Sequence, residues 1–157
     1  MDSQKPLEIL VVDDEAIVRR IFAIALKNFV ANVDTAVDGQ DGLTNYTARL
    51  TAGVPFDLVL TDLNMPSMNG AELTRRIKEL NTSTQVVVIT GYEATEEYKK
   101  IQETLGASKP EGVVQKPIGS DGLRHLVNQA MIVRDIRKSL RDYQPDPFSY
   151  IMPEPAA

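Results

Sequence analysis

The chain has 157 residues, of which 43% are hydrophobic and 25% charged, and its formal net charge is −5. This negative charge argues against a general nucleic-acid binder, because such domains usually carry a basic stripe. This length suits one domain with one core, and the lack of cysteine excludes disulfides, thiolate metal sites and cysteine nucleophiles. No apolar run approaches the roughly 20 residues that cross a bilayer, and the first residues lack an apolar leader, so we expect a cytoplasmic protein without membrane contact.

The hydrophobic pattern alternates between strands and helices from the beginning of the chain. Residues 7–12 form an apolar-rich strand, and residues 16–29 then show the i, i+3, i+4 spacing of an amphipathic helix. Residues 32–37 form a weaker strand whose polar residues suit the edge of a sheet, and a second helix follows over 40–50. The predicted buried face of the first helix comprises Val18, Ile21, Phe22, Ala25, Leu26 and Phe29.

A third strand lies in the middle of the chain, where residues 58–60 are all apolar. Such a run is typical of a strand that is covered on both faces, as in the centre of a parallel sheet. Asp62 follows this strand, and a loop over 66–70 leads into a third helix. The predicted buried side of that helix consists of Leu73, Ile77 and Leu80.

The second half of the chain repeats the pattern. Residues 85–89 form another apolar strand, residues 94–105 a more polar helix, and residues 113–115 a short strand. A last helix begins after Gly119, with an apolar face formed by Leu123, Leu126, Val127, Ala130 and Met131.

The helical pattern of the last helix continues beyond the expected end of the domain, up to Tyr143. We therefore predict a domain over residues 1–132, followed at 133–157 by a helical extension and a proline-rich tail, with no room for an output domain. The extension carries basic residues and an apolar row at Ile132, Ile136 and Leu140. A solvated face, pairing with a second copy and the start of a linker all remain open.

Five strands that alternate with helices predict an α/β fold with a doubly wound parallel sheet. Right-handed crossovers leave few windings, and the flavodoxin-like strand order 2-1-3-4-5 is the natural one for five units. Its switch point falls between the first and third strands. This arrangement places Asp13, Asp14 and Asp62 around one crevice at the carboxyl ends of the strands.

Five polar side chains follow four of these strands and should therefore reach the same edge of the sheet: Asp13, Asp14, Asp62, Thr90 and Lys116. Three carboxylates a few ångströms apart repel one another by several kcal/mol at an effective dielectric constant near 20. A divalent cation offsets this repulsion, and a set of carboxylate oxygens without histidine or cysteine suits Mg²⁺ or Mn²⁺. A carboxylate beside such a cation, faced by a hydroxyl and an ammonium group, suits phosphoryl transfer to Asp62.

Each of these residues also has a simpler interpretation. Asp13 and Asp14 could cap the first helix, the Thr90 hydroxyl could bond to backbone, and Lys116 could be an ordinary surface lysine. His125, the single histidine, is expected on the surface, which removes Ser-His-Asp hydrolysis from consideration. No glycine-rich phosphate loop follows any strand, so nucleotide and flavin binding are not predicted.

Taken together, these motifs resemble the CheY-like receiver domain of two-component response regulators. The resemblance covers residues 7–132 and rests on Asp13-Asp14, on Asp62-Leu63-Asn64-Met65-Pro66 with Gly70, on Thr90-Gly91 and on Lys116-Pro117. Each motif alone is weak, but their order and number make the resemblance specific.

The resemblance implies a Mg²⁺-dependent transfer of a phosphoryl group to Asp62 from a histidine kinase or phosphotransfer protein, and a switch in the binding of an output protein. Asp14, Asp62 and the backbone carbonyl of Asn64 would hold the cation directly, with Asp13 acting largely through water. Thr90 and Lys116 would contact the phosphoryl group, and the Lys116–Pro117 bond would be cis. The chain would be a phosphoacceptor that loses its phosphoryl group slowly, rather than an enzyme.

The chain departs from the family pattern on one side of the sheet. Val113 stands where many members carry a switch aromatic three residues before the lysine, and Tyr92 is an aromatic that could gate the phosphoryl group instead. Residues 108–111 suggest a longer loop. We therefore expect an altered output face. A homodimer through the last helix, or through the face formed by the fourth helix and fifth strand, is one option beside a solvated surface.

Two other functions stay open. One is a phosphohydrolase or phosphotransferase that acts on small molecules through an aspartate nucleophile, although such enzymes usually carry a second acid where this chain has Asn64. The other is a pseudo-receiver that binds partners without phosphorylation, which the intact acidic set disfavours.

Overall fold

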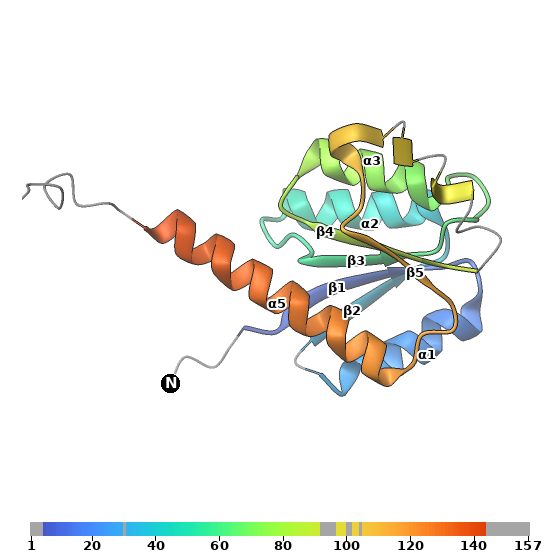
Figure 1. Cartoon of the computed structure of the whole chain (residues 1–157), viewed down its shortest axis with the longest axis horizontal. Helices are drawn as coiled ribbons and strands as arrows, with labels where there is room; N and C mark the ends of the chain where they lie inside the picture. Colours follow the sequence, from blue (N-terminus) through green and yellow to red (C-terminus); the bar gives the residue numbers. More distant parts are fainter. Residues whose placement is uncertain (1–4, 30, 92–96, 100–101, 104, 144–157) are drawn as a thin grey trace, which may run out of the picture.

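The protein forms one five-stranded parallel sheet with helices on both faces (Figure 1). The structure, a computed structural model, describes residues 5–29, 31–91, 97–99, 102–103 and 105–143. The strand order is β2-β1-β3-β4-β5, so the predicted order 2-1-3-4-5 and the edge position of the second strand are confirmed.

The observed elements follow the predicted ones closely. In chain order they are β1 (Leu7–Val12), α1 (Ala16–Lys27), β2 (Ala31–Ala36), α2 (Gly39–Thr51), β3 (Leu58–Thr61), α3 (Gly70–Leu80), β4 (Gln85–Thr90), the 3₁₀ helix η1 (Gly106–Ser108), β5 (Gly112–Gln115) and α5 (Ser120–Asp142). The predicted helix at 94–105 lies partly outside the described residues, but 97–99, 102–103 and 105 are helical.

The sheet separates two apolar layers, which explains why the central strands have few polar residues. Ile9 and Val11 of β1 face the layer that contains α1 and α5. Leu10 and Val12 face the opposite layer, which contains α2 and α3. Successive side chains of a strand point to opposite faces, so a strand in the middle of the sheet needs apolar residues at nearly every position.

Two residues that were predicted on buried helix faces are exposed. Ile21 of α1 is 54% exposed. The next residue, Phe22, lies about 100° further around the helix and is the one that packs against the sheet. Leu80 is 50% exposed at the end of α3. The last turn of α3 buries Lys78 instead, which is 6% exposed.

The last helix extends well past the sheet, as predicted (Figure 1). Its 23 residues begin at Ser120, and the last fully buried one is Ala130. The apolar row beyond it is open to solvent, with 58% exposure at Ile132, 55% at Ile136 and 69% at Leu140. The predicted tail lies, apart from Tyr143, outside the described residues. Within the described part of the chain, no helix combines the length and hydropathy needed to span a bilayer.

Candidate functional site

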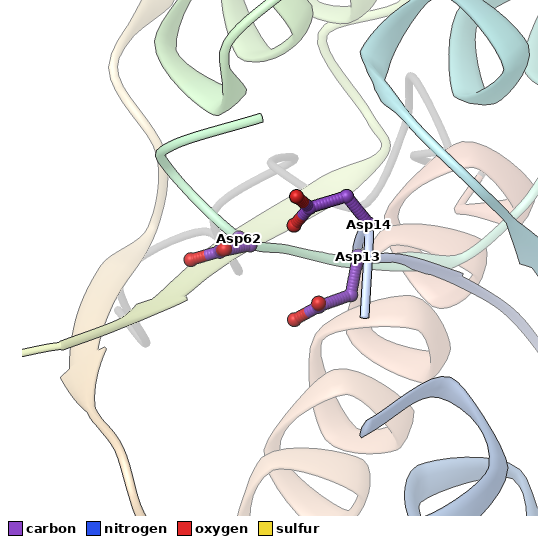
Figure 2. Close-up of side chains that lie close together, drawn as sticks. All are labelled: Asp13, Asp14 and Asp62. Carbon is purple, nitrogen blue, oxygen red and sulfur yellow. The ribbon is translucent and has the colours of Figure 1, made fainter. Parts of the chain in front are cut away.

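Three carboxylates meet at the carboxyl edge of the sheet, as the strand order predicts (Figure 2). Val12 of β1 pairs with Thr61 of β3, so Asp13 and Asp62 leave neighbouring strands at the same level. Oxygen atoms of Asp13, Asp14 and Asp62 all lie within 4.8 Å of one another. Asp13 is buried, Asp62 is half-buried and Asp14 is exposed, so the cluster opens toward solvent on one side.

Lys116 joins this cluster from the end of β5. Its Nζ lies 2.8 Å from Oδ2 of Asp13 and 3.7 Å from Oδ1 of Asp62. The Lys116 backbone N–H donates to the carbonyl of Thr90 at 2.8 Å, and the Lys116–Pro117 bond is cis, as the resemblance implied. The side chain is only 23% exposed, so its interpretation as a surface lysine is wrong.

The charges of the cluster shift the pKa of two of its members. Burial raises the pKa of Asp62 above its usual value, the Lys116 charge opposes this, and the Asp13 charge adds to it. Burial tends to lower the pKa of Lys116, but the hydrogen bond to Asp13 and the charge of Asp62 outweigh it, so this pKa is raised. The ammonium group therefore stays charged beside the two carboxylates.

Thr90 reaches Asp62 from the end of β4. Its side chain is 1% exposed, and its hydroxyl forms a hydrogen bond with the Asp62 carboxylate. The backbone N–H of Leu63 donates to Oδ1 of Asp62 at 2.9 Å. Next to Thr90, a Cβ at Gly91 would meet no atom of the described residues within 4 Å beyond its chain neighbours.

The capping interpretation of the paired aspartates is not supported. Glu15 is the N-cap residue of α1, and no side chain caps that helix. Oδ1 of Asp13 accepts a hydrogen bond of 2.9 Å from the Glu15 backbone N–H, and Oδ2 accepts one from Lys116. Both oxygens of Asp13 therefore have partners, whereas the carboxylate of Asp14 is exposed to solvent.

The loop after β3 fixes the backbone of Asp62. A Cβ at Gly70 would lie 2.1 Å from the Asp62 carbonyl oxygen, and the Gly70 N–H donates to Leu63 O at 2.8 Å. Asn69 accepts from the Glu72 N–H at 2.8 Å and so caps α3. The sequence motif includes Gly70, but the motif does not predict this close contact, because it depends on how the loop folds back on Asp62. Asn64 is exposed in the same loop, and its carbonyl stays a predicted ligand.

Val113 packs against a hydrophobic cluster that contains Tyr98. Tyr98 is 1% exposed, and its hydroxyl has no hydrogen-bond partner among the described residues. Burial raises its pKa to about 12. Tyr92 lies outside the described residues.

The predicted loop at 108–111 makes specific contacts at both of its ends. Its first residue closes η1, and Glu111 binds both the backbone N–H of Val86 and the ammonium group of Lys78. His125 is exposed, as predicted.

The donor set fits a hard divalent cation. Three carboxylates contribute oxygen atoms, and no histidine or cysteine takes part. Mg²⁺ is commonly held by one or two carboxylates, with water and phosphate oxygens as its other ligands, and the partly open cluster leaves room for them. The site can therefore hold Mg²⁺ or Mn²⁺ beside the Asp62 carboxylate.

Known proteins match most of the chain. The family model for the response regulator receiver domain matches residues 9–128. The chain is 34% identical over 138 residues to the sensor histidine kinase RcsC of Salmonella typhi, a match that covers 88% of this chain and 13% of that protein. It is 37% identical over 94 residues to the response regulator ArlR of Staphylococcus aureus, covering 60% of this chain and 39% of that protein. The chain thus spans well under half the length of either relative.

Solved structures share the fold. A response regulator receiver domain protein from Clostridium thermocellum superposes with a TM-score of 0.73 at 24% identity, covering 83% of this chain and 98% of that one. The chemotaxis protein CheY4 of Vibrio cholerae superposes with a TM-score of 0.66 at 24% identity, covering 80% and 98%. At this level of identity the likeness concerns the fold alone.

Proposed function

Because this chain belongs to the response regulator receiver domain family, we propose that Asp62 accepts a phosphoryl group from the phosphohistidine of a histidine kinase or a phosphotransfer protein. The observation that carries this proposal is the grouping of three carboxylates with the Lys116 ammonium group and the Thr90 hydroxyl at one edge of the sheet. One relative is named a sensor histidine kinase and another a response regulator, which supports a role in phosphorelay signalling.

A divalent cation, Mg²⁺ or Mn²⁺, is part of the proposal. Asp14, Asp62 and the carbonyl of Asn64 would hold it directly. Asp13 would act through water, which its existing bonds to Lys116 and the Glu15 N–H support. When bound, the cation offsets negative charge on the carboxylates and on the phosphoryl oxygens.

The proposed transfer is a displacement at phosphorus. An Asp62 oxygen forms a new P–O bond while the P–N bond to the donor histidine breaks, and the electron pair of that bond returns to the imidazole nitrogen, which takes a proton from solvent. The Lys116 ammonium group stabilises charge on the transferred group. Attack of water on the aspartyl phosphate would later release inorganic phosphate, and we expect this step to be slow.

Phosphorylation would act as a switch through Thr90. Its hydroxyl bonds the Asp62 carboxylate, and it would turn to a phosphoryl oxygen once that carboxylate is phosphorylated. The added charge of about −1.5 to −2 is enough to bias a surface with two states toward the one that an output protein binds. Val113 stands at the usual aromatic position, and it packs in the same cluster as the buried aromatic Tyr98.

We also propose that the last helix takes part in assembly. The exposed row Ile132, Ile136 and Leu140 continues to Tyr143, which is 67% exposed, and this row would pair with a second copy. The face formed by the fourth helix and β5 is an alternative surface for a homodimer. We propose a cytoplasmic location, with which a chain that cannot form disulfides is compatible.

The competing interpretation, a small-molecule phosphohydrolase, lacks a supporting observation. Such an enzyme needs a general acid near its nucleophile, and the residue two positions after Asp62 is Asn64, whose amide cannot supply a proton. We therefore propose a phosphoacceptor rather than a turnover enzyme.

Incubation with acetyl phosphate and Mg²⁺, followed by intact mass spectrometry, tests the acceptor. We expect the mass gain of one phosphoryl group in the wild type and none in Asp62→Asn, while Asp34→Asn, a carboxylate on β2 that pairs with Arg49, behaves as wild type. A gain that persists in Asp62→Asn overturns the assignment of Asp62. Sustained turnover of p-nitrophenyl phosphate would support the hydrolase instead.

A further inference from the structure

A hollow lies at the end of the sheet where the strands begin, opposite the end that carries Asp62. It is formed between the segment before β3, the turn that leads into β4 and the projecting half of α5, and its volume is about 430 Å³. Pockets of this size accommodate small organic molecules. Because it lies where the strands begin, the hollow shares no residue with the acidic cluster.

The hollow is basic, although the chain as a whole is acidic. Arg134, Arg137 and Arg141 line it against a single carboxylate, Asp57. At about 100° per residue these arginines lie within an arc of roughly 60° on the helix, so one face of α5 carries all three. Three guanidinium groups and one carboxylate leave an excess of two positive charges, on a chain whose net charge is −5.

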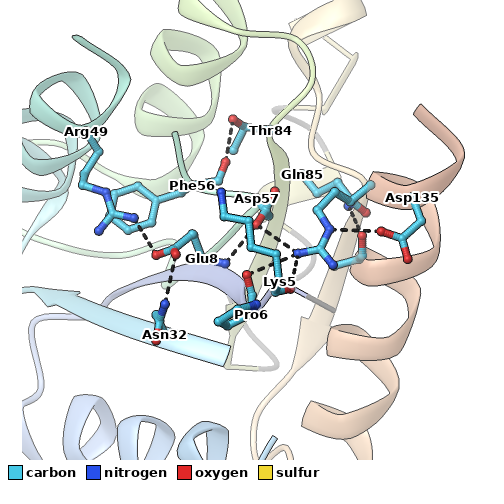
Figure 3. Close-up of polar contacts among 12 residues, drawn as sticks. Lys5, Pro6, Glu8, Asn32, Arg49, Phe56, Asp57, Thr84, Gln85 and Asp135 are labelled. Atoms are coloured by element: carbon cyan, nitrogen blue, oxygen red, sulfur yellow. Dashed lines mark hydrogen bonds and ion pairs between the residues drawn. The ribbon is translucent and has the colours of Figure 1, made fainter. Parts of the chain in front are cut away.

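The innermost arginine, Arg134, is fixed in place by hydrogen bonds to Lys5, Pro6 and Asp135, which Figure 3 labels. Nη1 of Arg134 donates to the carbonyl oxygens of Lys5 at 3.0 Å and Pro6 at 3.3 Å, and its Nε donates to Asp135 at 3.2 Å. Asp57 lies 3.7 Å from Arg134 and also accepts from the Glu8 backbone N–H at 2.9 Å. The single carboxylate of the hollow is therefore already engaged.

The outer two arginines retain most of their donors. Arg137 bonds the carbonyl oxygen of Ser83 through Nη1, and the structure gives its other guanidinium nitrogens no partner among the described residues. Arg141 has neither a hydrogen bond nor an ion pair with any described residue, although it lines the hollow. Two guanidinium groups thus border a hollow with unused N–H donors, which is the geometry that binds a phosphate group through paired hydrogen bonds.

From these observations we propose that the hollow binds a small organic phosphate, whose phosphate group is held by Arg137 and Arg141. Pro55 and Leu140, which also line the hollow, offer apolar surface to the organic part of the ligand. Binding here needs neither Asp62 nor a divalent cation, so this inference stands apart from the proposed phosphorylation.

The proposed ligand and the proposed pairing row of the last helix share Leu140, but not Ile132 or Ile136. Ile132 and Ile136 lie roughly 130° or more around the helix from the centre of the arginine face, at about 100° per residue. Ile132 and Ile136 are more than half exposed and do not line the hollow. The ligand would instead connect the projecting half of α5 to the turn before β4, through Arg137 and Ser83.

Isothermal titration calorimetry of the full chain tests the site, with inorganic phosphate and adenosine monophosphate as probes, without Mg²⁺ and at low ionic strength. We expect Arg137→Gln and Arg141→Gln each to weaken binding roughly tenfold, as for the loss of a hydrogen bond to a charged group. Lys138→Gln is the matched control, because it removes the same charge from the same stretch of helix without lining the hollow. Asp62→Asn should bind as the wild type does.

Each outcome bears on the proposal. Tighter binding of adenosine monophosphate than of inorganic phosphate supports recognition of both parts of the ligand, whereas equal affinities would contradict a role for the apolar wall. An equal loss in Lys138→Gln and Arg141→Gln would mean general charge attraction and would overturn the site. Absence of binding by both probes would also overturn it. Because Arg141 forms no hydrogen bond or ion pair with another described residue, its substitution should leave the unfolding midpoint nearly unchanged.

Discussion

Lys78 of α3 and Glu111 at the start of β5 form an ion pair across the beginning of β4. The Lys78 side chain is 6% exposed, and its Nζ also donates to the carbonyl of Thr84 at 2.8 Å. The other carboxylate oxygen of Glu111 accepts from the Val86 N–H at 2.6 Å. This pair therefore connects α3, β4 and β5 where the strands begin, at the end of the sheet opposite Asp62.

Loss of one partner of this pair should be costly. Glu111→Ala leaves the Lys78 ammonium group buried without its counter-ion, and we expect the free energy of unfolding to fall by about 3 kcal/mol. Lys78→Met should cost less, because Glu111 is 34% exposed and can be hydrated. Urea unfolding monitored by circular dichroism gives both values, and a larger loss in Lys78→Met than in Glu111→Ala would contradict the argument.

Removal of the Tyr98 hydroxyl should stabilise the folded protein. This hydroxyl is buried without a partner among the described residues, so Tyr98→Phe should raise the free energy of unfolding by about 1 kcal/mol. Tyr46→Phe is the matched control, because the Tyr46 hydroxyl is also buried but lies 2.7 Å from the hydroxyl of Thr84. That substitution should lower stability by about 1 kcal/mol. Destabilisation by Tyr98→Phe would indicate that its hydroxyl has a partner.

The same residue should make the protein sensitive to alkali. Burial raises the pKa of Tyr98 to about 12, from the usual 10.0 of a tyrosine. A group whose pKa is raised on folding stabilises the native state below its unfolded pKa, and this stabilisation is lost as pH rises from about 10 toward 12. Unfolding curves at pH 9 to 11 should therefore show a steeper loss for the wild type than for Tyr98→Phe. Equal slopes would show that Tyr98 ionises normally in the folded protein.

Gly70 should tolerate no side chain. Its Cβ would lie 2.1 Å from the Asp62 carbonyl oxygen, so Gly70→Ala must shift the backbone that carries the acceptor. We expect a loss of about 1 to 3 kcal/mol, as for overpacking of a core, and slower phosphorylation by acetyl phosphate. Gly112→Ala is the control, because a Cβ there meets no atom within 4 Å. Wild-type stability and phosphorylation in Gly70→Ala would disprove the close contact.

Glu8 should contribute to acid sensitivity (Figure 3). Burial tends to raise its pKa, but bonds from Asn32 at 3.0 Å and Arg49 at 2.5 Å outweigh this, so the pKa is lowered. A lowered pKa gives stability that is present above the unfolded value near 4.5 and is lost as pH falls below it. Glu8→Gln should therefore flatten the fall in stability between about pH 5 and 3. An unchanged slope would assign acid sensitivity to other carboxylates.

The sheet and most of the site were predictable because both depend on strands. A strand buried on both faces is apolar at nearly every position, and the ends of parallel strands share one edge, so Asp13, Asp62 and Lys116 could be grouped from sequence. Lys78 and Glu111 could not, because a charged residue in a helix or loop usually lies in solvent. The close contact at Gly70 and the partnerless hydroxyl of Tyr98 depend on distances between segments that no local pattern encodes.

The length of α5 beyond the sheet has a mechanical consequence. The helix continues from Ala130 to Asp142, which at 1.5 Å per residue is roughly 18 Å beyond its last fully buried residue, and bonds from Arg134 and Arg137 hold the first half of this stretch to the domain. A tilt of about 5° at its base therefore moves its tip by about 1.5 Å. The projecting helix would therefore act as a lever arm, in which a small change of angle near Leu123 and Val127 becomes a larger displacement at the far end.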